Sequence, residues 1–293
     1  MDETRQGKNF TPKLDQRNRN GRIFQVICLV GTFLGIILLA LLMLRVLADG
    51  LPRLDWNAIA NVPSQVNPDE AGFRIALLGT MWITVFTLMI AVPLGVGSAI
   101  YLEEYAPKNR FTQLLELNIA NLAGVPSVIY GVLGLGLFVR LIGLGPVVLA
   151  GSMTMSLVIL PVIIVASREA IRSVPLSMRE ASYGVGATKW QTISNHVLPY
   201  SLPGILTGVI IGVSRAIGDS ASLLIIGGLV FITTNPNLFS RFIVLPLQIY
   251  FNISQPQDAY KQLAAAGIII LLVALLILNA SAIYVRNRFE QRY

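Results

Sequence analysis

The sequence of 293 residues has one cysteine and one histidine. Cys28 lies inside an apolar run, so the chain has no pair for a disulfide and no cysteine-based metal site. His196 alone can form neither a metal site nor a proton relay. These two shortages argue against a metal site, and we expect no cofactor and no catalytic residue either.

Charged residues are also scarce. They make up 13% of the chain, against about 25% in soluble domains. Hydrophobic residues make up 54%, which is more than a soluble core can absorb. The composition therefore predicts an all-α integral membrane protein.

Motifs for nucleotide or metal-dependent chemistry are missing. The chain contains neither a glycine-rich GxxxxGK[ST] loop nor an HExxH motif. Gly218-Asp219-Ser220 resembles a hydrolase serine motif in its letters, but no histidine in a suitable register supports it. We therefore expect the chain not to bind ATP in the usual manner and not to be an enzyme.

Six apolar segments are long enough to cross a bilayer, which takes about 20 residues per helix. The first follows a basic tail but is too long for a signal peptide, so we interpret it as a retained anchor. Gly124-Val125-Pro126-Ser127 interrupts the third segment. The six predicted spans cover residues of about 23–48, 73–102, 113–139, 146–167, 200–231 and 263–285.

The distribution of Lys and Arg predicts the orientation. With the N-terminus inside, 15 of the 22 basic residues lie in inside segments, four in outside loops and three in or beside spans. This asymmetry places both termini in the cytoplasm. It also explains the basic balance of +7 without a nucleic-acid partner. The predicted regions are a basic tail (1–22), a transmembrane domain (23–286) and a short C-terminal tail (287–293).

The polar stretch of about 172–199 is predicted to be a structured cytoplasmic loop. Ser177 with Glu180, and Thr188 with Gln191, have the spacing of capping boxes, which start helices. Gly184 and Gly186 lie between them, where a chain that turns often needs positive φ. Pro199 is compatible with the start of the next long helix. We expect two short helices at a sharp angle that dock on a partner.

The fifth segment carries charge inside the bilayer. On a helical wheel Gly204, Gly208, Gly212, Arg215 and Asp219 fall within about 80°. Small residues at this spacing allow close approach of another helix. Arg215 and Asp219, at i and i+4, can pair. The arginine has three possible roles: a structural ion pair with Asp219, contact with the membrane interface, or anion binding. Arg168, at the inner end of the fourth segment, could help release an anion or simply anchor the helix.

The loop resembles the EAA motif of ABC importer permeases. Glu180, Ala181, Gly186, Leu198 and Pro199 match, Ser182 replaces the third small residue, and His196 stands where the motif has an aliphatic residue. The chain after its N-terminal tail is similar to the phosphate permeases of the PstA type. The similarity is carried by residues 99–106, 118–127, 214–218, 263–267 and 286–289. That family usually has Gly-Glu-Thr at positions 218–220.

The resemblance implies a six-helix permease fold with cytoplasmic coupling helices in a bacterial inner membrane. It implies import of inorganic phosphate together with a PstC-type permease, a PstB-type ATPase dimer and a PstS-type binding protein. Arg215, Asp219, Ser220 and Arg168 would line the substrate pathway. The implied ATPase-coupling residues are Glu180, Ala181, Ser182, Gly186 and Ala187.

Three alternatives remain open at this stage. An ABC importer of the same kind could import another oxyanion, such as sulfate or molybdate, or a small organic solute. A secondary anion transporter working alone would have no use for a docking loop. An intramembrane enzyme would need a nucleophile beside Arg215 and Asp219, and the sequence offers none there.

Overall fold

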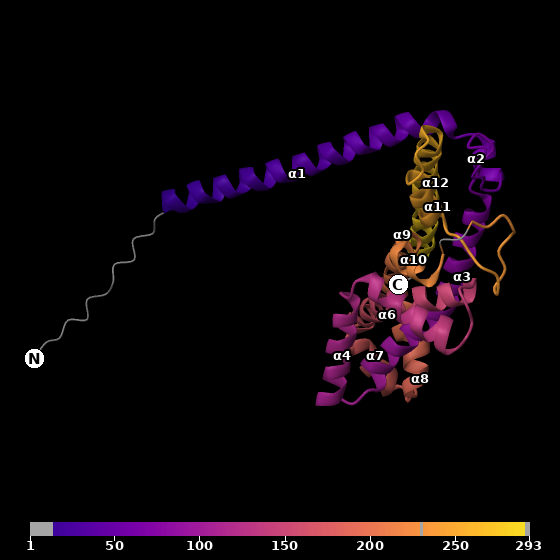
Figure 1. Ribbon diagram of the computed structural model, residues 1–293. Helices are drawn as coiled ribbons and strands as arrows, with labels where there is room; N and C mark the ends of the chain where they lie inside the picture. The colour runs from indigo at the N-terminus through magenta and orange to yellow at the C-terminus, as the bar shows by residue number, and fades with distance from the viewer. Residues whose placement is uncertain (1–13, 229–230, 291–293) are drawn as a thin grey trace, which may run out of the picture. The chain divides into compact units, whose positions relative to one another are not determined.

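The computed structural model describes residues 14–228 and 231–290, which form two units divided after Ala48 (Figure 1). Of the predicted basic tails, Arg5, Lys8, Lys13 and Arg292 lie outside the described residues. In the first unit, α1 (Leu14–Gly50) begins well before the predicted span and exposes large apolar side chains such as Phe24 and Leu42. Exposed apolar side chains on a helix of this length suit a hydrocarbon environment.

In the second unit, the described residues form helices joined by irregular loops, and the one strand-like pairing among them is a single antiparallel bridge between Val147 and Arg241. Its long helices are α3 (Arg74–Ile100), α6 (Val148–Arg172), α9 (Leu198–Gly218) and α12 (Asp258–Glu290). The shorter helices are η1 (Leu51–Arg53), α2 (Trp56–Ala60), α4 (Arg110–Ala123), α5 (Ser127–Gly134), α7 (Leu176–Gly184), α8 (Lys189–Thr192), α10 (Ala221–Ile226) and α11 (Leu245–Ile253). Three π-helical segments extend longer helices: η2 (Tyr101–Tyr105), η3 (Leu135–Leu141) and η4 (Ile193–Val197).

The all-α membrane fold is confirmed. Five described helices are long and apolar enough to span a bilayer, and the α4–α5 pair makes up to six if it counts as one broken span. That pair is bent by 101° at Gly124–Pro126, so the predicted third span is not a continuous helix. The predicted fifth span is also interrupted, because α9 ends at Gly218 and α10 starts at Ala221.

Helix α6 is the centre of the second unit, and α3, α4, α5, α9 and α10 pack around it. Hydroxyl groups join it to α3. Thr87 Oγ1 donates to the carbonyl of Ser152 at 3.2 Å, and Ser156 Oγ donates to the carbonyl of Thr87 at 3.2 Å. Such interhelical hydrogen bonds hold helices together where lipid removes the hydrophobic drive between them.

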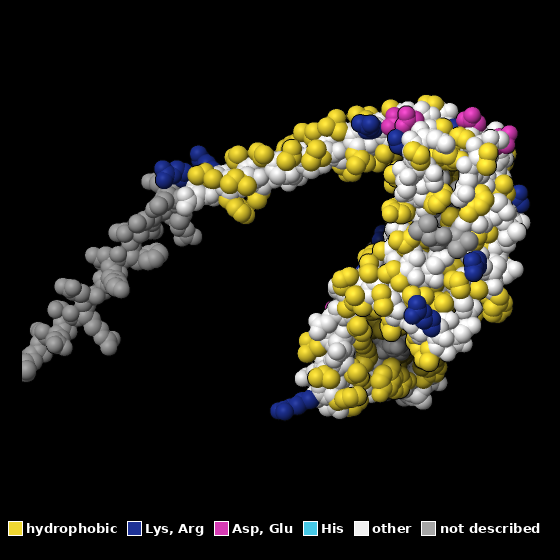
Figure 2. All heavy atoms as spheres, in the orientation of Figure 1, with side chains coloured by type: hydrophobic (Ala, Val, Ile, Leu, Met, Phe, Trp, Pro, Cys, Tyr) yellow, Lys and Arg dark blue, Asp and Glu magenta, His cyan; other side chains and the backbone are white. Residues whose placement is uncertain are grey.

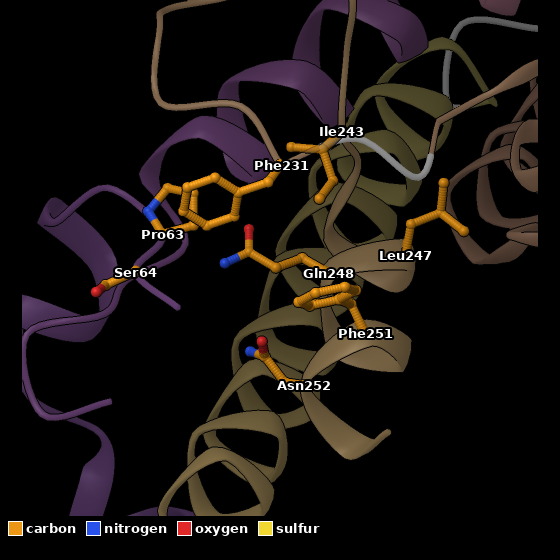
Figure 3. A pocket seen from close by; sticks show the side chains of 8 residues that line it. All are labelled: Pro63, Ser64, Phe231, Ile243, Leu247, Gln248, Phe251 and Asn252. Carbon is orange, nitrogen blue, oxygen red and sulfur yellow. The ribbon is translucent and has the colours of Figure 1, made fainter. Parts of the chain in front are cut away.

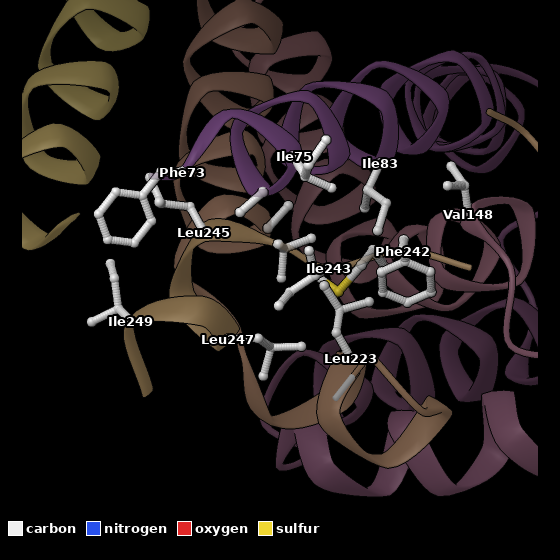
Figure 4. Packing of buried hydrophobic residues seen from close by; sticks show 14 of the residues in the cluster. Phe73, Ile75, Ile83, Val148, Leu223, Phe242, Ile243, Leu245, Leu247 and Ile249 are labelled. Atoms are coloured by element: carbon white, nitrogen blue, oxygen red, sulfur yellow. The ribbon is translucent and has the colours of Figure 1, made fainter. Parts of the chain in front are cut away.

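The largest buried cluster lies where α3, α10, α11 and the segment before α11 meet (Figure 4). Phe73, Phe242 and Leu245 are each at most 1% exposed. The packing is close enough that a Cβ atom on Gly79 would lie 2.1 Å from the carbonyl oxygen of Ile243. Figure 2 shows apolar side chains spread over the visible face of the long helices, with acidic side chains at the end that carries α2. This distribution fits a body embedded in lipid with its ends in water.

The glycine stripe of α9 packs directly on α6. A Cβ atom on Gly204 would lie 2.6 Å from Ala170 Cβ, and one on Gly208 would lie 2.4 Å from Ala166 Cβ. Gly212 faces Ile163 at 3.4 Å. The prediction that these glycines admit another helix is confirmed.

We expect Gly208→Leu to reduce the amount of folded protein, because a side chain there must push α9 away from α6. Overpacking of this kind costs about 1–3 kcal/mol or more. The measurement is thermal stability and yield of the purified protein. Gly97→Leu is the matched control, since a Cβ atom at that helical glycine meets no atom within 4 Å. Equal stability of the two variants would contradict the prediction.

Candidate functional site

Two helix breaks meet in the second unit. One separates α4 from α5 at Gly124–Pro126, and the other separates α9 from α10 at Asp219–Ser220. Ser127 Oγ donates to Asp219 Oδ1 at 3.1 Å and so joins the first residue of α5 to the second break. Unpaired backbone groups at membrane depth are tolerated where protein or a water-filled cavity satisfies them. The paired breaks are therefore the strongest candidate for a polar pathway through the described helices.

Asp219 is not helical and does not pair with Arg215. Its φ and ψ are −84° and 106°, and no ion pair within 4 Å joins the two side chains. Its carboxylate instead accepts hydrogen bonds from the backbone N–H of Ala221 at 3.0 Å and from the hydroxyl of Ser222 at 3.3 Å. The expectation of a helical i, i+4 pair is wrong, because the chain leaves the helix after Gly218 and turns the carboxylate towards α10.

Arg215 is half-buried and has most of its donors unused. Its Nη1 donates to the carbonyl oxygen of Ala123 over 3.4 Å, which is its one hydrogen bond within the described part of the chain. A guanidinium has five N–H donors. Arg215 therefore reaches the last carbonyls of α4 and retains donors for an anion. Ser220 lies in the α9–α10 break, half-buried at the N-cap position of α10, without a side-chain capping bond.

Arg168 lies in a different cluster, with carboxylates on both sides. Its Nη2 is 3.3 Å from Glu103 Oε2 and 2.8 Å from Glu116 Oε1. Arg172 pairs with Glu103 at 3.3 Å. Cavities of about 460 and 430 Å³ flank this cluster, and Arg168, Arg172, Glu116 and Gln113 line both. An anion at Arg168 would have to compete with two carboxylates, whereas Arg215 faces no carboxylate within ion-pair distance.

The pocket shown in Figure 3 lies between α11 and the segment that holds Pro63 and Ser64. Its walls are mainly apolar, with the amides of Gln248 and Asn252 among them. Gln248 Oε1 and Asn252 Nδ2 are buried without a partner there. The cavity of about 20 Å³ has room for roughly one water molecule, so it is too small for an oxyanion.

The loop between α6 and α9 has an exposed apolar tip. Val185 is 86% exposed and Trp190 59% exposed, and Glu180 and Ala181 are exposed beside them. Gly186 has a φ of +84°, as predicted. Ser182 is buried, and its hydroxyl lies 2.9 Å from that of Thr192, which ties α7 to α8. Ala187 is half-buried and donates its N–H to the carbonyl of Ser182 at 3.2 Å.

The two predicted capping boxes had different outcomes. The box at Thr188 and Gln191 is confirmed, since both reciprocal hydrogen bonds are present. The box at Ser177 and Glu180 is wrong, because Pro175 occupies the N-cap and α7 begins at Leu176. Pro199 does not start a separate helix either. The helical run from Lys189 to Gly218 is continuous, with η4 ahead of the proline. Only α7 is a separate short helix.

Residues 91–293 match the family model described as "Binding-protein-dependent transport system inner membrane component". The chain belongs to this family of ABC importer permeases. It is 31% identical over 251 residues to the probable ABC transporter permease protein YqgI of Bacillus subtilis, covering 81% of this chain and 85% of that one. It is 33% identical over 214 residues to the phosphate transport system permease protein PstA 1 of Mycobacterium tuberculosis, covering 72% and 70%. These similarities confirm the resemblance to permeases of the PstA type.

Solved structures support the permease fold. This chain aligns with a chain from the crystal structure of a bacterial alginate ABC transporter, with a TM-score of 0.67 and 16% identity, covering 94% of this chain and 97% of that one. At this identity the likeness concerns the fold alone. The family and the relatives together make this chain a multi-pass membrane permease component of an ABC importer.

Three candidate functional residues of the permease were not predicted from the sequence. Glu103, Glu104 and Glu116 form ion pairs with arginines 52 to 75 positions away in sequence. The available signal was the adjacent pair Glu103-Glu104 at the C-terminal end of the second apolar segment, within the stretch 99–106 that carries the family resemblance. Two neighbouring carboxylates at the end of a membrane helix are costly unless paired.

Proposed function

We propose that this permease forms half of the translocation pathway of an importer for inorganic phosphate, with a PstC-type permease as the other half. The observation that carries the proposal is Arg215, a half-buried guanidinium with unused donors at the junction of two helix breaks. Planar guanidinium groups suit tetrahedral oxyanions. Relatives named as phosphate permeases, including PstA of Yersinia pestis at 27% identity over 275 residues, favour phosphate over other oxyanions.

In the proposed mechanism, Arg215 provides a weak station for the anion, beside Asp219 and Ser220. Weak binding is required because a substrate held tightly would not leave. Asp219 acts indirectly. Its carboxylate accepts hydrogen bonds from the Ser127 hydroxyl and the Ala221 N–H, and these bonds join the α9–α10 break to α5. Arg168 marks the inner end of the pathway, where it is paired with Glu103 and Glu116.

The loop is proposed to dock on a PstB-type ATPase dimer, which hydrolyses ATP, while a PstS-type protein delivers phosphate from outside. The exposed Glu180 and Ala181 lie beside the apolar tip formed by Val185 and Trp190. Ser182, Gly186 and Ala187 shape the loop from within. Binding of ATP would move the loop, and the spans would follow. Neither a nucleic acid nor a bound cofactor has a role in this mechanism.

The substrate is tested by uptake of labelled phosphate and labelled sulfate into proteoliposomes that contain the complete complex. Saturable, ATP-dependent uptake of phosphate alone supports the proposal. Uptake of sulfate alone would identify an importer of another oxyanion. Anion uptake by the permease without any ATPase would instead indicate a secondary transporter.

The proposed orientation places both termini and the α7–α8 loop in the cytoplasm of a bacterial cell, with regions 1–22, 23–286 and 287–293 as predicted. Two valines with matched exposure test it: Val185 in the loop (86%) and Val66 after α2 (85%). In a Cys28→Ser background, a membrane-impermeant maleimide should modify Val66→Cys in intact cells. It should modify Val185→Cys only after permeabilisation. Modification of Val185→Cys in intact cells, with Val66→Cys modified only after permeabilisation, would place the α7–α8 loop and both termini outside the cell.

A further inference from the structure

The π-helical end of α3 directs two adjacent carboxylates to different helices. Within η2, Glu103 pairs with Arg168 and Arg172 of α6, each at 3.3 Å. Glu104 pairs with Arg179 of α7 at 2.9 Å. Short π-helical segments are frequent at functional sites. The η2 segment, at the C-terminal end of α3, therefore contacts both α6 and the docking loop.

The contact with the loop is well buried. The side chains of Arg179 and Glu104 are 14% and 9% exposed. Arg179 also donates to the carbonyl oxygens of Val174 at 2.6 Å and Ile171 at 2.9 Å, at the end of α6. Lys189, the first residue of α8, lies 4.8 Å above the ring of Tyr105. Both loop helices therefore contact η2, and a displacement of the loop must displace the end of α3 or break these contacts.

The ion pairs extend from Glu103 towards the proposed pathway. Arg168 bridges Glu103 of η2 and Glu116 of α4. Helix α4 then ends at Ala123, whose carbonyl oxygen accepts the hydrogen bond of Arg215. The two cavities beside Arg168 and Glu116 leave space in which these side chains can exchange partners. Buried ion pairs add little net stability compared with apolar packing, so a role in stability alone does not explain the cluster.

We propose that Glu103 and Glu104 are positioning residues that carry movement of the α7–α8 loop through Arg168 and Glu116 to α4, and so to the break at Arg215. The proposal deepens the proposed function and rests on it for the role of the loop. Coupling between distant sites is explained physically by a two-state element whose equilibrium both sites bias. The chain of ion pairs from Arg179 to Glu116 is that element.

The test follows movement of α4 without any transported anion. In a Cys28→Ser background, Leu117→Cys provides a reporter on α4, because Leu117 is 64% exposed and lines the cavity beside Glu116. The rate of its modification by a maleimide is measured in the complete complex, with and without ATP and vanadate. With the ion pairs intact we expect ATP to change this rate by about tenfold, a typical allosteric coupling.

Glu104→Gln and Glu116→Gln should each abolish most of the change while the complex still assembles and hydrolyses ATP. Glu104→Asp, which retains the charge, should preserve most of it. Asp258→Asn is the control, because the Asp258 side chain is 88% exposed and, among the residues that the structure describes, pairs only with Lys261. If Glu104→Gln yields no complex, the ATP response of Glu116→Gln tests the inference by itself.

An unchanged ATP response in Glu116→Gln, or no response with the ion pairs intact, would overturn the inference. In Glu116→Gln, a loss of response that merely follows a loss of assembled complex would do the same. The reporter needs ATP but no anion, so absence of phosphate uptake would overturn the proposed function while leaving this result in place.

Discussion

Arg215→Ala is expected to reduce phosphate uptake by at least about tenfold, the value of one charge-assisted hydrogen bond to a desolvated anion. Among the described residues, the Arg215 guanidinium is the one cation at the paired helix breaks, and no carboxylate lies within 4 Å of it there. Its loss leaves the described residues at the two helix breaks without a positive charge. The measurement is the initial rate of labelled phosphate uptake into proteoliposomes with the complete complex.

Assembly should survive this substitution. Arg215 makes a single hydrogen bond of 3.4 Å within the described residues, so its removal leaves one carbonyl, that of Ala123, without a donor. The glycine stripe that packs α9 on α6 is untouched. Recovery of the complex at native levels, with uptake lost, would assign Arg215 to the pathway rather than to the fold.

Arg215→Lys separates charge from geometry. Lysine retains the positive charge but loses the planar fork that binds two oxygens of an oxyanion at once. We expect uptake between that of the native chain and that of Arg215→Ala. Arg140→Ala serves as the control, because Arg140 is exposed and lies away from both breaks in sequence. Native uptake by Arg215→Ala would contradict the pathway role.

The second large effect is expected at Gly186. Gly186→Val should reduce phosphate uptake strongly while the ATPase subunits remain active. At a φ of +84° an L residue costs about 1–2 kcal/mol, and a β-branched side chain adds to the strain. The N–H of Gly186 bonds to the carbonyl of Tyr183 at 2.9 Å, which closes the turn after α7. A distorted turn would shift Val185 and Glu180 on the docking face. The measurement is ATP hydrolysed per phosphate imported.

Gly184→Val is the matched control. Gly184 lies two residues earlier, has negative φ, and a Cβ atom there meets no atom within 4 Å. Glu180→Gln complements the pair, since Glu180 is exposed and forms no ion pair in the described part of the chain. Loss of coupling in Glu180→Gln would therefore reflect a partner contact. The loop assignment fails if Gly186→Val and Glu180→Gln both import phosphate at the native ratio.

The sequence by itself determined the membrane class, the positions of the long helices and the EAA-like loop. Each rests on a local pattern: apolar runs for α3, α6 and α12, the Thr188 and Gln191 spacing for α8, and glycines four residues apart for the contact of α9 with α6. Local patterns predict local structure well, because the residues that decide it are neighbours in the chain.

Only the tertiary structure decided the composition of the polar site. A helical wheel assumes a continuous helix, so it placed Asp219 beside Arg215, whereas the chain breaks at Gly218 and Asp219 binds Ser127, 92 positions away. Likewise, Ser182 is buried against Thr192 and is not on the docking face. The partners of Arg168 and Arg179 come from η2 and α4. Contacts between residues so far apart depend on how the helices cross, and no short stretch of sequence specifies that geometry.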